Sequence, residues 1–116
     1  MQVKDIYLKV KQHLLTQNEK AQRFTEFSDL VGCAYKAKDG KMCAVGCLIK
    51  DYNPNMEGRV VEYLIAEFPN ALGYLDLTHE KIDLLQELQV IHDGVSPQYW
   101  KKELEAYEQR TNILNS

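Results

Sequence analysis

Three cysteines and one histidine are the residues of this sequence that could bind a metal ion. Cys33, Cys43 and Cys47 follow a C-x9-C-x3-C spacing, and His92 would be a fourth ligand. Zinc takes four sulfur or nitrogen ligands in a tetrahedron, usually from two closely spaced pairs, and only the second spacing fits. Unpaired cysteines more often behave as small buried hydrophobic residues. The sequence therefore predicts core packing for the cysteines, with no metal and no cofactor.

A cysteine nucleophile is a second chemistry that these residue types allow. Cys47 follows a glycine, and a position at the start of a helix would lower its pKa and favour the thiolate. His92 would then be the base, and Asp93 or Glu57 would orient it. A histidine on an apolar helix face is more often a core or pocket-wall residue. A Cys/His enzyme acting on a nucleotide is therefore kept as an alternative.

Positive charge gathers in the middle of the chain, on Lys36, Lys38, Lys41, Lys50 and Arg59. Tyr35 and Tyr52 offer flat faces for stacking a base, and the cations could hold a phosphate. No Gly-rich phosphate loop of the common ATP or dinucleotide enzymes is present. This combination favours a nucleotide-sized anionic ligand over duplex nucleic acid.

Apolar side chains recur at helical spacing in four places, so most of these residues are expected to lie on helices or beside them. Helices are expected from Val3 to Leu14, over 54–68 after Asn53-Pro54, after Thr78, and after Ser96-Pro97. The helix over 54–68 would place Arg59 near its N-terminus, where an anion is favoured. Residues 18–30 are less periodic and indicate a short helix or a packed loop.

One hairpin is expected between the first helix and the helix over 54–68. Asp39-Gly40 separates two short runs and is a strong turn signal. With these residues at the turn, Lys36 pairs with Cys43 and Tyr35 with Ala44. The fold class is therefore α+β: one mostly helical domain over residues 1–116 with a single small antiparallel β-hairpin.

Composition limits the class of protein further. The 116 residues are 45% hydrophobic and 27% charged, with a net charge of −3, which is typical of one globular domain. No run is long enough to span a membrane. The N-terminus is not a signal peptide, and three cysteines make no disulfide framework, so the cytoplasm is expected. Residues 61–116 hold four Lys/Arg and ten Asp/Glu. A third hypothesis is therefore a protein–protein inhibitor that uses this acidic helical surface, with Tyr99 and Trp100 as anchors.

Three separated blocks resemble a family of small uncharacterised proteins from bacteriophages and bacterial genomes. They are GCAYKAKDGKMCAVGCLI, NPNMEG and VIHD. Lys36-Ala37 stands where that family usually has Arg-Gly, and Lys50 where it has proline. The resemblance implies no established reaction. It directs attention to Cys33, Tyr35, Lys41, Cys43, Gly46, Cys47, Met56, Glu57, Gly58, His92 and Asp93.

The leading hypothesis is a phage-type, non-enzymatic binding protein of the host cytoplasm. It would sequester a nucleotide-like signalling molecule, or block a host protein, and so counter host defence. The ligand-binding residues expected are Tyr35, Lys36, Lys41, Glu57, Arg59, His92 and Asp93. Tyr35 would stack, Lys36 and Arg59 would meet phosphate, and the other polar groups would bind ribose or base edges. A homodimer with a shared pocket is compatible with so small a chain.

Overall fold

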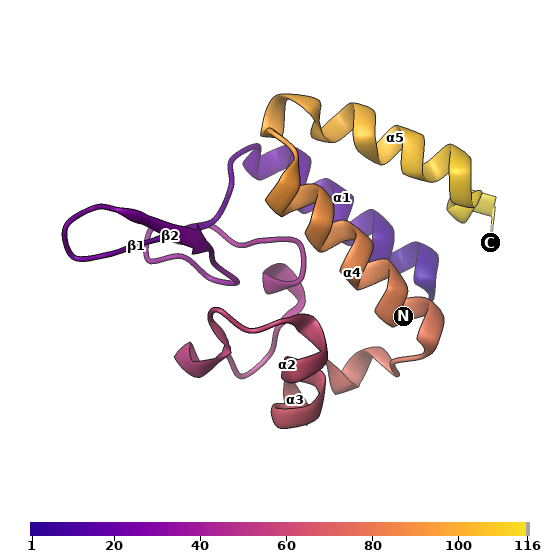
Figure 1. Ribbon diagram of the computed structural model, residues 1–116. Helices are drawn as coiled ribbons and strands as arrows, with labels where there is room; N and C mark the ends of the chain where they lie inside the picture. The colour runs from indigo at the N-terminus through magenta and orange to yellow at the C-terminus, as the bar shows by residue number, and fades with distance from the viewer. Residues whose placement is uncertain (116) are drawn as a thin grey trace.

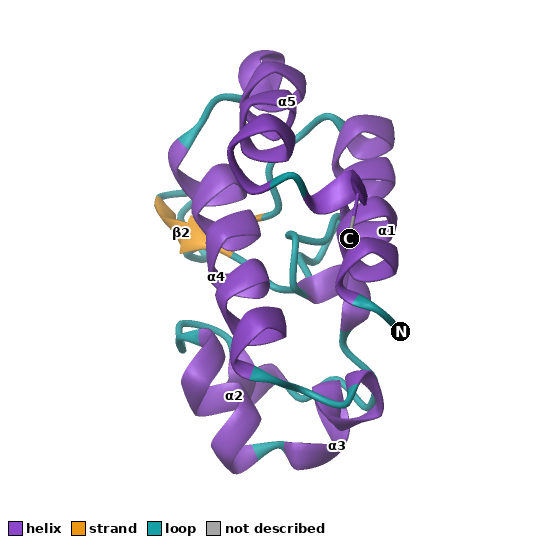
Figure 2. Ribbon diagram, turned by 90° about the vertical axis from the view of Figure 1, so that its right-hand side faces the viewer, coloured by secondary structure: helices purple, strands orange, loops and turns teal. Residues whose placement is uncertain are grey.

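Three long helices pack against one another as a bundle (Figure 1). The computed structural model describes residues 1–115. The helices are α1 (Val3–Gln17), α4 (His79–Gly94) and α5 (Trp100–Thr111), and each contacts the other two. Two short helices, α2 (Val61–Glu67) and α3 (Pro69–Leu72), lie at one end of this bundle (Figure 2). Within the described range, no helix has the length and apolar character needed to cross a membrane.

Short 3₁₀ turns connect these helices. They are η1 (Gly46–Leu48), η2 (Pro54–Met56), η3 (Gly73–Leu75), η4 (Pro97–Tyr99) and η5 (Ile113–Asn115).

The amphipathic helices form where their apolar spacing predicts them. In α1, the side chains of Ile6, Tyr7, Val10 and Leu14 are all buried. α4 begins at the expected cap, because the Thr78 hydroxyl accepts a hydrogen bond from a backbone N–H one turn later. α5 buries Trp100, Leu104 and Tyr107 on one face. Burial of these stripes against one another makes the core, since helices this short gain most of their stability from packing.

The single helix expected over 54–68 is wrong. The chain forms η2, leaves the helical conformation, and starts α2 only at Val61. Gly58 lies at the break with a φ of +77°, a conformation that residues with side chains rarely adopt. Asn53 does cap as expected, accepting the N–H of Asn55, but it caps the short turn. Arg59 therefore lies in a loop before α2.

The antiparallel hairpin that completes the α+β class lies earlier in the chain than expected. β1 (Gln22–Phe24) pairs with β2 (Leu30–Cys33), with Gln22 opposite Cys33. This ribbon projects away from the helices (Figure 1). The fold class is confirmed, whereas the short helix or packed loop expected over 18–30 is wrong.

The Asp39-Gly40 segment does turn the chain back, but it forms only one isolated bridge, between Lys36 and Met42. Lys36 was expected opposite Cys43, so the pairing is displaced by one residue. The second arm cannot continue as a strand because the chain enters η1 a few residues after Met42. The turn predicted at Asp39-Gly40 is therefore present, but a 3₁₀ turn takes the place of the predicted second strand.

Candidate functional site

Glu57 joins its own loop and Tyr52 to the turn at residues 35–36, more than twenty positions earlier in the chain. Its carboxylate accepts the backbone N–H groups of Tyr35 (2.8 Å) and Lys36 (3.1 Å) and the hydroxyl of Tyr52 (2.6 Å). The three donors occupy most of the lone-pair directions of the carboxylate. Glu57 was expected to bind ribose or a base edge. In the structure its hydrogen bonds hold the turn at 35–36 against the loop that precedes η2.

Tyr35 is in the core and does not offer a stacking face. Its side chain is only 7% exposed, and its hydroxyl donates to the carbonyl of Arg59 at 2.5 Å. Its own carbonyl accepts the N–H of Cys43 and lies against Gly46, where a Cβ atom would come within 1.8 Å of it. The stacking role expected for Tyr35 does not fit this environment, because a base could not reach a ring that is already packed.

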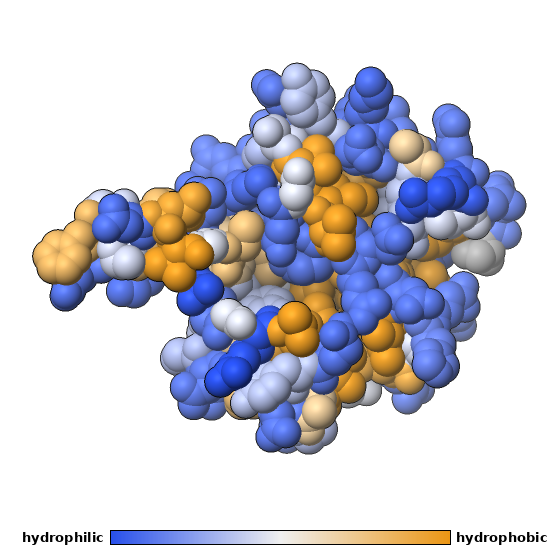
Figure 3. All heavy atoms as spheres, in the orientation of Figure 1, coloured by the Kyte–Doolittle hydropathy of each residue, from blue (hydrophilic) through white to orange (hydrophobic). Residues whose placement is uncertain are grey.

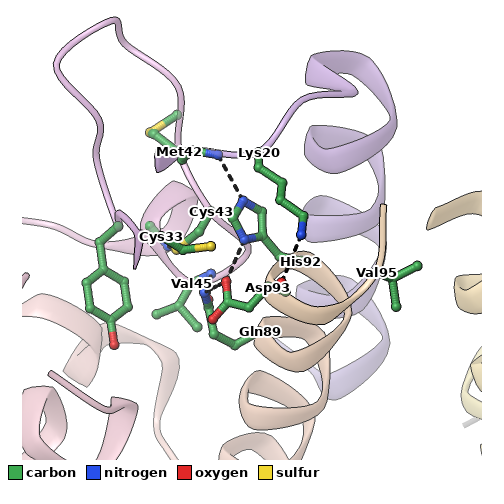
Figure 4. A network of polar contacts seen from close by, with 12 residues as sticks. Lys20, Cys33, Met42, Cys43, Val45, Gln89, His92, Asp93 and Val95 are labelled. Atoms are coloured by element: carbon green, nitrogen blue, oxygen red, sulfur yellow. Dashed lines mark hydrogen bonds and ion pairs between the residues drawn. The ribbon is translucent and has the colours of Figure 1, made fainter. Parts of the chain in front are cut away.

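His92 is fully buried at the end of α4, and both of its ring nitrogens are occupied (Figure 4). Nε2 lies 3.1 Å from the backbone nitrogen of Ala21, which donates to it, and Nδ1 lies 2.7 Å from a carboxylate oxygen of Asp93. An N–H donor at Ala21 requires an unprotonated Nε2, so the neutral ring carries its proton on Nδ1 and donates it to Asp93. The ring also stacks on Trp100, with centroids 5.4 Å apart.

Asp93 accepts from several donors besides His92. Burial would raise the pKa of its carboxyl, but hydrogen bonds from His92, Cys33 and Gln89 hold that pKa below its usual range. Lys20 meanwhile donates to the backbone carbonyl of Asp93 (Figure 4). Asp93 and His92 therefore form an acid–imidazole pair whose distal nitrogen faces a backbone N–H instead of a nucleophile.

Cys33, His92 and Asp93 are the one group within residues 1–115 whose potential metal-binding atoms come together, all within 4.8 Å of one another. An ion on Nδ1 would displace the Nδ1 proton. The neutral imidazole would then carry its proton on Nε2, opposite the N–H of Ala21. A metal could bind here only after that hydrogen bond broke. Cys43 and Cys47 do not belong to this group.

The three thiols are held in their protonated form. Burial raises the pKa of Cys43 to about 12 and those of Cys33 and Cys47 to about 11; the neighbouring Asp93 carboxylate adds to the effect at Cys33. The Cys47 thiol donates to the carbonyl of Ala44 and does not share a cluster with His92. A nucleophilic cysteine needs a depressed pKa and a nearby base. The arrangement around Cys47 supplies neither.

Two hollows bring the remaining expected residues to the surface. The α2–α4 cleft, of about 560 Å³, is lined by Cys33, Ala34, Tyr35, Gly58, Arg59, Val60, Val61, Glu62, Gln86, Gln89, Val90, Asp93 and Gly94. The hairpin groove, of about 720 Å³, is lined by Gln22, Arg23, Phe24, Thr25, Val31, Lys36, Ala37, Lys38, Asp39, Tyr52, Pro54 and Glu57.

The expected ligand-binding residues are thus divided between two places. Tyr35, Arg59 and Asp93 line the α2–α4 cleft, whereas Lys36 and Glu57 line the hairpin groove. The remaining two, Lys41 and His92, line neither hollow. Lys41 forms ion pairs with Glu19 and Asp39 on the surface.

Arg23 is the groove residue that sequence reasoning missed. Its Nε donates to the carbonyl of Cys33 (3.2 Å), and its terminal nitrogens lie beside Gly58, where a Cβ atom would be 3.5 Å away. The local sequence over 22–25 does not alternate between polar and apolar residues, so it gives no strand signal there.

Trp100, suggested as an exposed anchor for a protein partner, is fully buried and donates its indole N–H to the carbonyl of Val95. Tyr99 beside it is exposed.

Comparison of the chain with protein-family models, curated proteins and solved structures found no match. The geometry of the two hollows therefore carries the functional inference.

Proposed function

We propose that this protein is a non-enzymatic binding protein for a nucleotide-like anion, and that the hairpin groove is its binding site. The observation that carries the proposal is the grouping of three cations, Arg23, Lys36 and Lys38, with the rings of Phe24 and Tyr52 around one groove. Cations suit phosphate, aromatic rings suit a base, and about 720 Å³ lies within the size range of small-molecule sites.

The charges of the groove favour an anion. Its two carboxylates are already engaged: Glu57 accepts three hydrogen bonds, and Asp39 accepts from the backbone and side chain of Lys41. By contrast, none of the three cations forms an ion pair within residues 1–115. Lys36 lies over the ring of Tyr52, 5.7 Å from its centroid. The groove lining holds three cations and two carboxylates, so its net charge is +1 and a phosphate would enter a positive site.

Sequestration is the mechanism that such a site would serve. The resemblance to phage proteins suggests that the ligand is a signalling nucleotide of the host defence, held away from its receptor. A sequestering protein must outcompete that receptor, which requires nanomolar affinity, equivalent to about −12 kcal/mol.

Isothermal titration of the full chain with a panel of cyclic and linear nucleotides tests this proposal. We expect one nucleotide to bind, and the double variant Lys36→Gln/Lys38→Gln to weaken its binding at least about tenfold, since each charge-assisted hydrogen bond contributes ~1.5–3 kcal/mol. Lys101→Gln/Lys102→Gln on α5 removes the same charge from an exposed helix face and should leave affinity unchanged. No heat with any nucleotide, or equal loss in both double variants, would overturn the proposal.

Cys47→Ser separates binding from the alternative of Cys/His catalysis. A binding protein of this kind should keep its nucleotide affinity and release the nucleotide chemically unchanged. Turnover of the nucleotide that Cys47→Ser abolishes would establish the enzyme instead.

A further inference from the structure

The β1–β2 hairpin leaves its large apolar side chains uncovered. Phe27 and Leu30 are 79% and 59% exposed, and Phe24 and Val31, which also line the hairpin groove, are 56% and 53% exposed. The space-filling view shows apolar residues along the hairpin where it projects from the body (Figure 3). A two-stranded ribbon is marginally stable on its own in water, and contiguous exposed apolar surface marks interaction sites. These properties indicate that the hairpin is covered by another chain.

β2 also has an edge on which another strand could pair. Within residues 1–115 the sheet contains two strands, so β2 has β1 on one side and no other strand of this range on its second side. An edge of this kind presents backbone N–H and C=O groups to any incoming strand. The partner of the hairpin is therefore expected to be extended and to carry apolar side chains.

The α2–α4 cleft begins where β2 ends, because Cys33 is both the last residue of the strand and part of the cleft wall. Val60 and Val90 on this wall are 63% and 65% exposed, which gives the cleft an apolar rim. The Arg59 guanidinium lies over the Tyr63 ring, 4.7 Å from its centroid, and has no ion-pair partner within residues 1–115. The cleft wall thus combines an apolar rim with one cation, Arg59, and two carboxylates, Glu62 and Asp93.

The tip of the hairpin carries apolar and acidic side chains. It consists of residues 25–29, in which Phe27 is flanked by Glu26 and Asp29. Phe27 is the most exposed large apolar side chain of the described range. An aromatic ring complements the apolar rim of the cleft, and Arg59 is the cation of the wall with which either flanking acid can pair.

We propose that a second copy of this chain covers the hairpin, forming a two-fold dimer. The β2 strands of the two copies pair antiparallel, and the tip of each hairpin enters the α2–α4 cleft of the other copy. Antiparallel pairing centred on Val31 places Leu30 of one copy opposite Gly32 of the other. It brings the tip of each hairpin toward the segment that follows Cys33 in the other copy, where Tyr35 lines the cleft. The contact is self-complementary, as a two-fold interface requires.

Sedimentation velocity of the full chain, over a concentration series without nucleotide, tests the dimer. We expect a monomer–dimer equilibrium in which Phe27→Ser raises the dissociation constant at least about tenfold, or ~1.4 kcal/mol. Phe27 is so exposed that its replacement should leave the fold intact. Tyr99→Ser, which removes another exposed aromatic side chain outside the hairpin, should have no effect. A monomer at every concentration, or a dimer that Phe27→Ser leaves unchanged, overturns the proposal.

Charge reversal tests where the tip lies. Arg59→Glu and Glu26→Arg should each weaken the dimer, because each brings like charges together, and the double variant should recover most of the lost affinity. A double variant no better than the worse single variant would overturn the placement of the tip in the cleft. Because no nucleotide is present, these outcomes are independent of the proposed binding function.

Discussion

At the scale of single residues, His92 and Asp93 show how residue types can suggest a chemistry that their partners prevent. An aspartate on Nδ1 of a histidine is the arrangement that orients a general base, whose Nε2 then accepts a proton. Here Nε2 already accepts the backbone N–H of Ala21, and the ring is fully buried against Trp100. The pair therefore ties the start of the hairpin region to the end of α4.

His92→Phe is expected to destabilise the protein. Phenylalanine keeps the ring that packs on Trp100 but leaves the buried N–H of Ala21 without an acceptor, at a cost of about 1–3 kcal/mol. Urea unfolding monitored by circular dichroism would measure this loss of stability. His79→Phe, at an exposed position at the start of α4, is the control. Equal stability of the two variants would contradict the structural role of His92.

At the scale of elements, η1 packs closely against the turn at residues 35–43. The N–H of Gly46 donates to the sulfur of Cys43, and its Cα faces the carbonyl of Tyr35. Any side chain at this position would push η1 away from Tyr35 and thereby disturb the hydrogen bonds that Glu57 makes with the same turn. The glycine is thus required for the close approach of two elements.

Gly46→Ala should lower the free energy of unfolding by about 1–3 kcal/mol, the usual cost of overpacking a core. Gly73→Ala provides a matched comparison, because no atom lies within 4 Å of its added methyl group and its backbone is right-handed helical. That variant should be neutral or more stable by up to about 1 kcal/mol. Thermal unfolding of both variants would decide, and a Gly46→Ala protein as stable as Gly73→Ala would contradict the close contact.

At the scale of the whole molecule, Glu108 links the first and last long helices. Its carboxylate accepts from the Lys11 ammonium and the Tyr7 hydroxyl, each at 2.5 Å. Partial burial would raise the pKa of Glu108, but these two donors hold it below its usual range. The folded state therefore binds fewer protons here than the unfolded state as the solution is acidified.

Stability should consequently fall as the pH drops through the ordinary glutamate pKa of about 4.3 and below, because protons bind the unfolded chain first. The contribution of Glu108 is fully present above that range. Glu108→Gln should lose stability at neutral pH and show a shallower decline on acidification. Glu105→Gln, on the exposed side of α5, should keep the wild-type pH profile. Unfolding titrations across this range check the difference, and identical profiles for the two variants would contradict it.

The sequence by itself determined the three long helices. The apolar stripes of α1, α4 and α5 and the cap at Thr78 are local patterns, and a helix expresses such a pattern within a few residues. It also indicated that Lys36 belongs to a basic region with Tyr52 nearby, and both line the hairpin groove.

Only the tertiary structure decided where the hairpin lies and which residues share a hollow. Strand pairing depends on register, and a shift of one residue changes every partner. The contact between Ala21 and His92 spans 71 positions, and Glu57 reaches back 22 positions to Tyr35. Such partners cannot be predicted from their spacing in the sequence, because the packing of the intervening chain decides whether they come into contact. For that reason Tyr35, Arg59 and Asp93 line one hollow and Lys36 and Glu57 another.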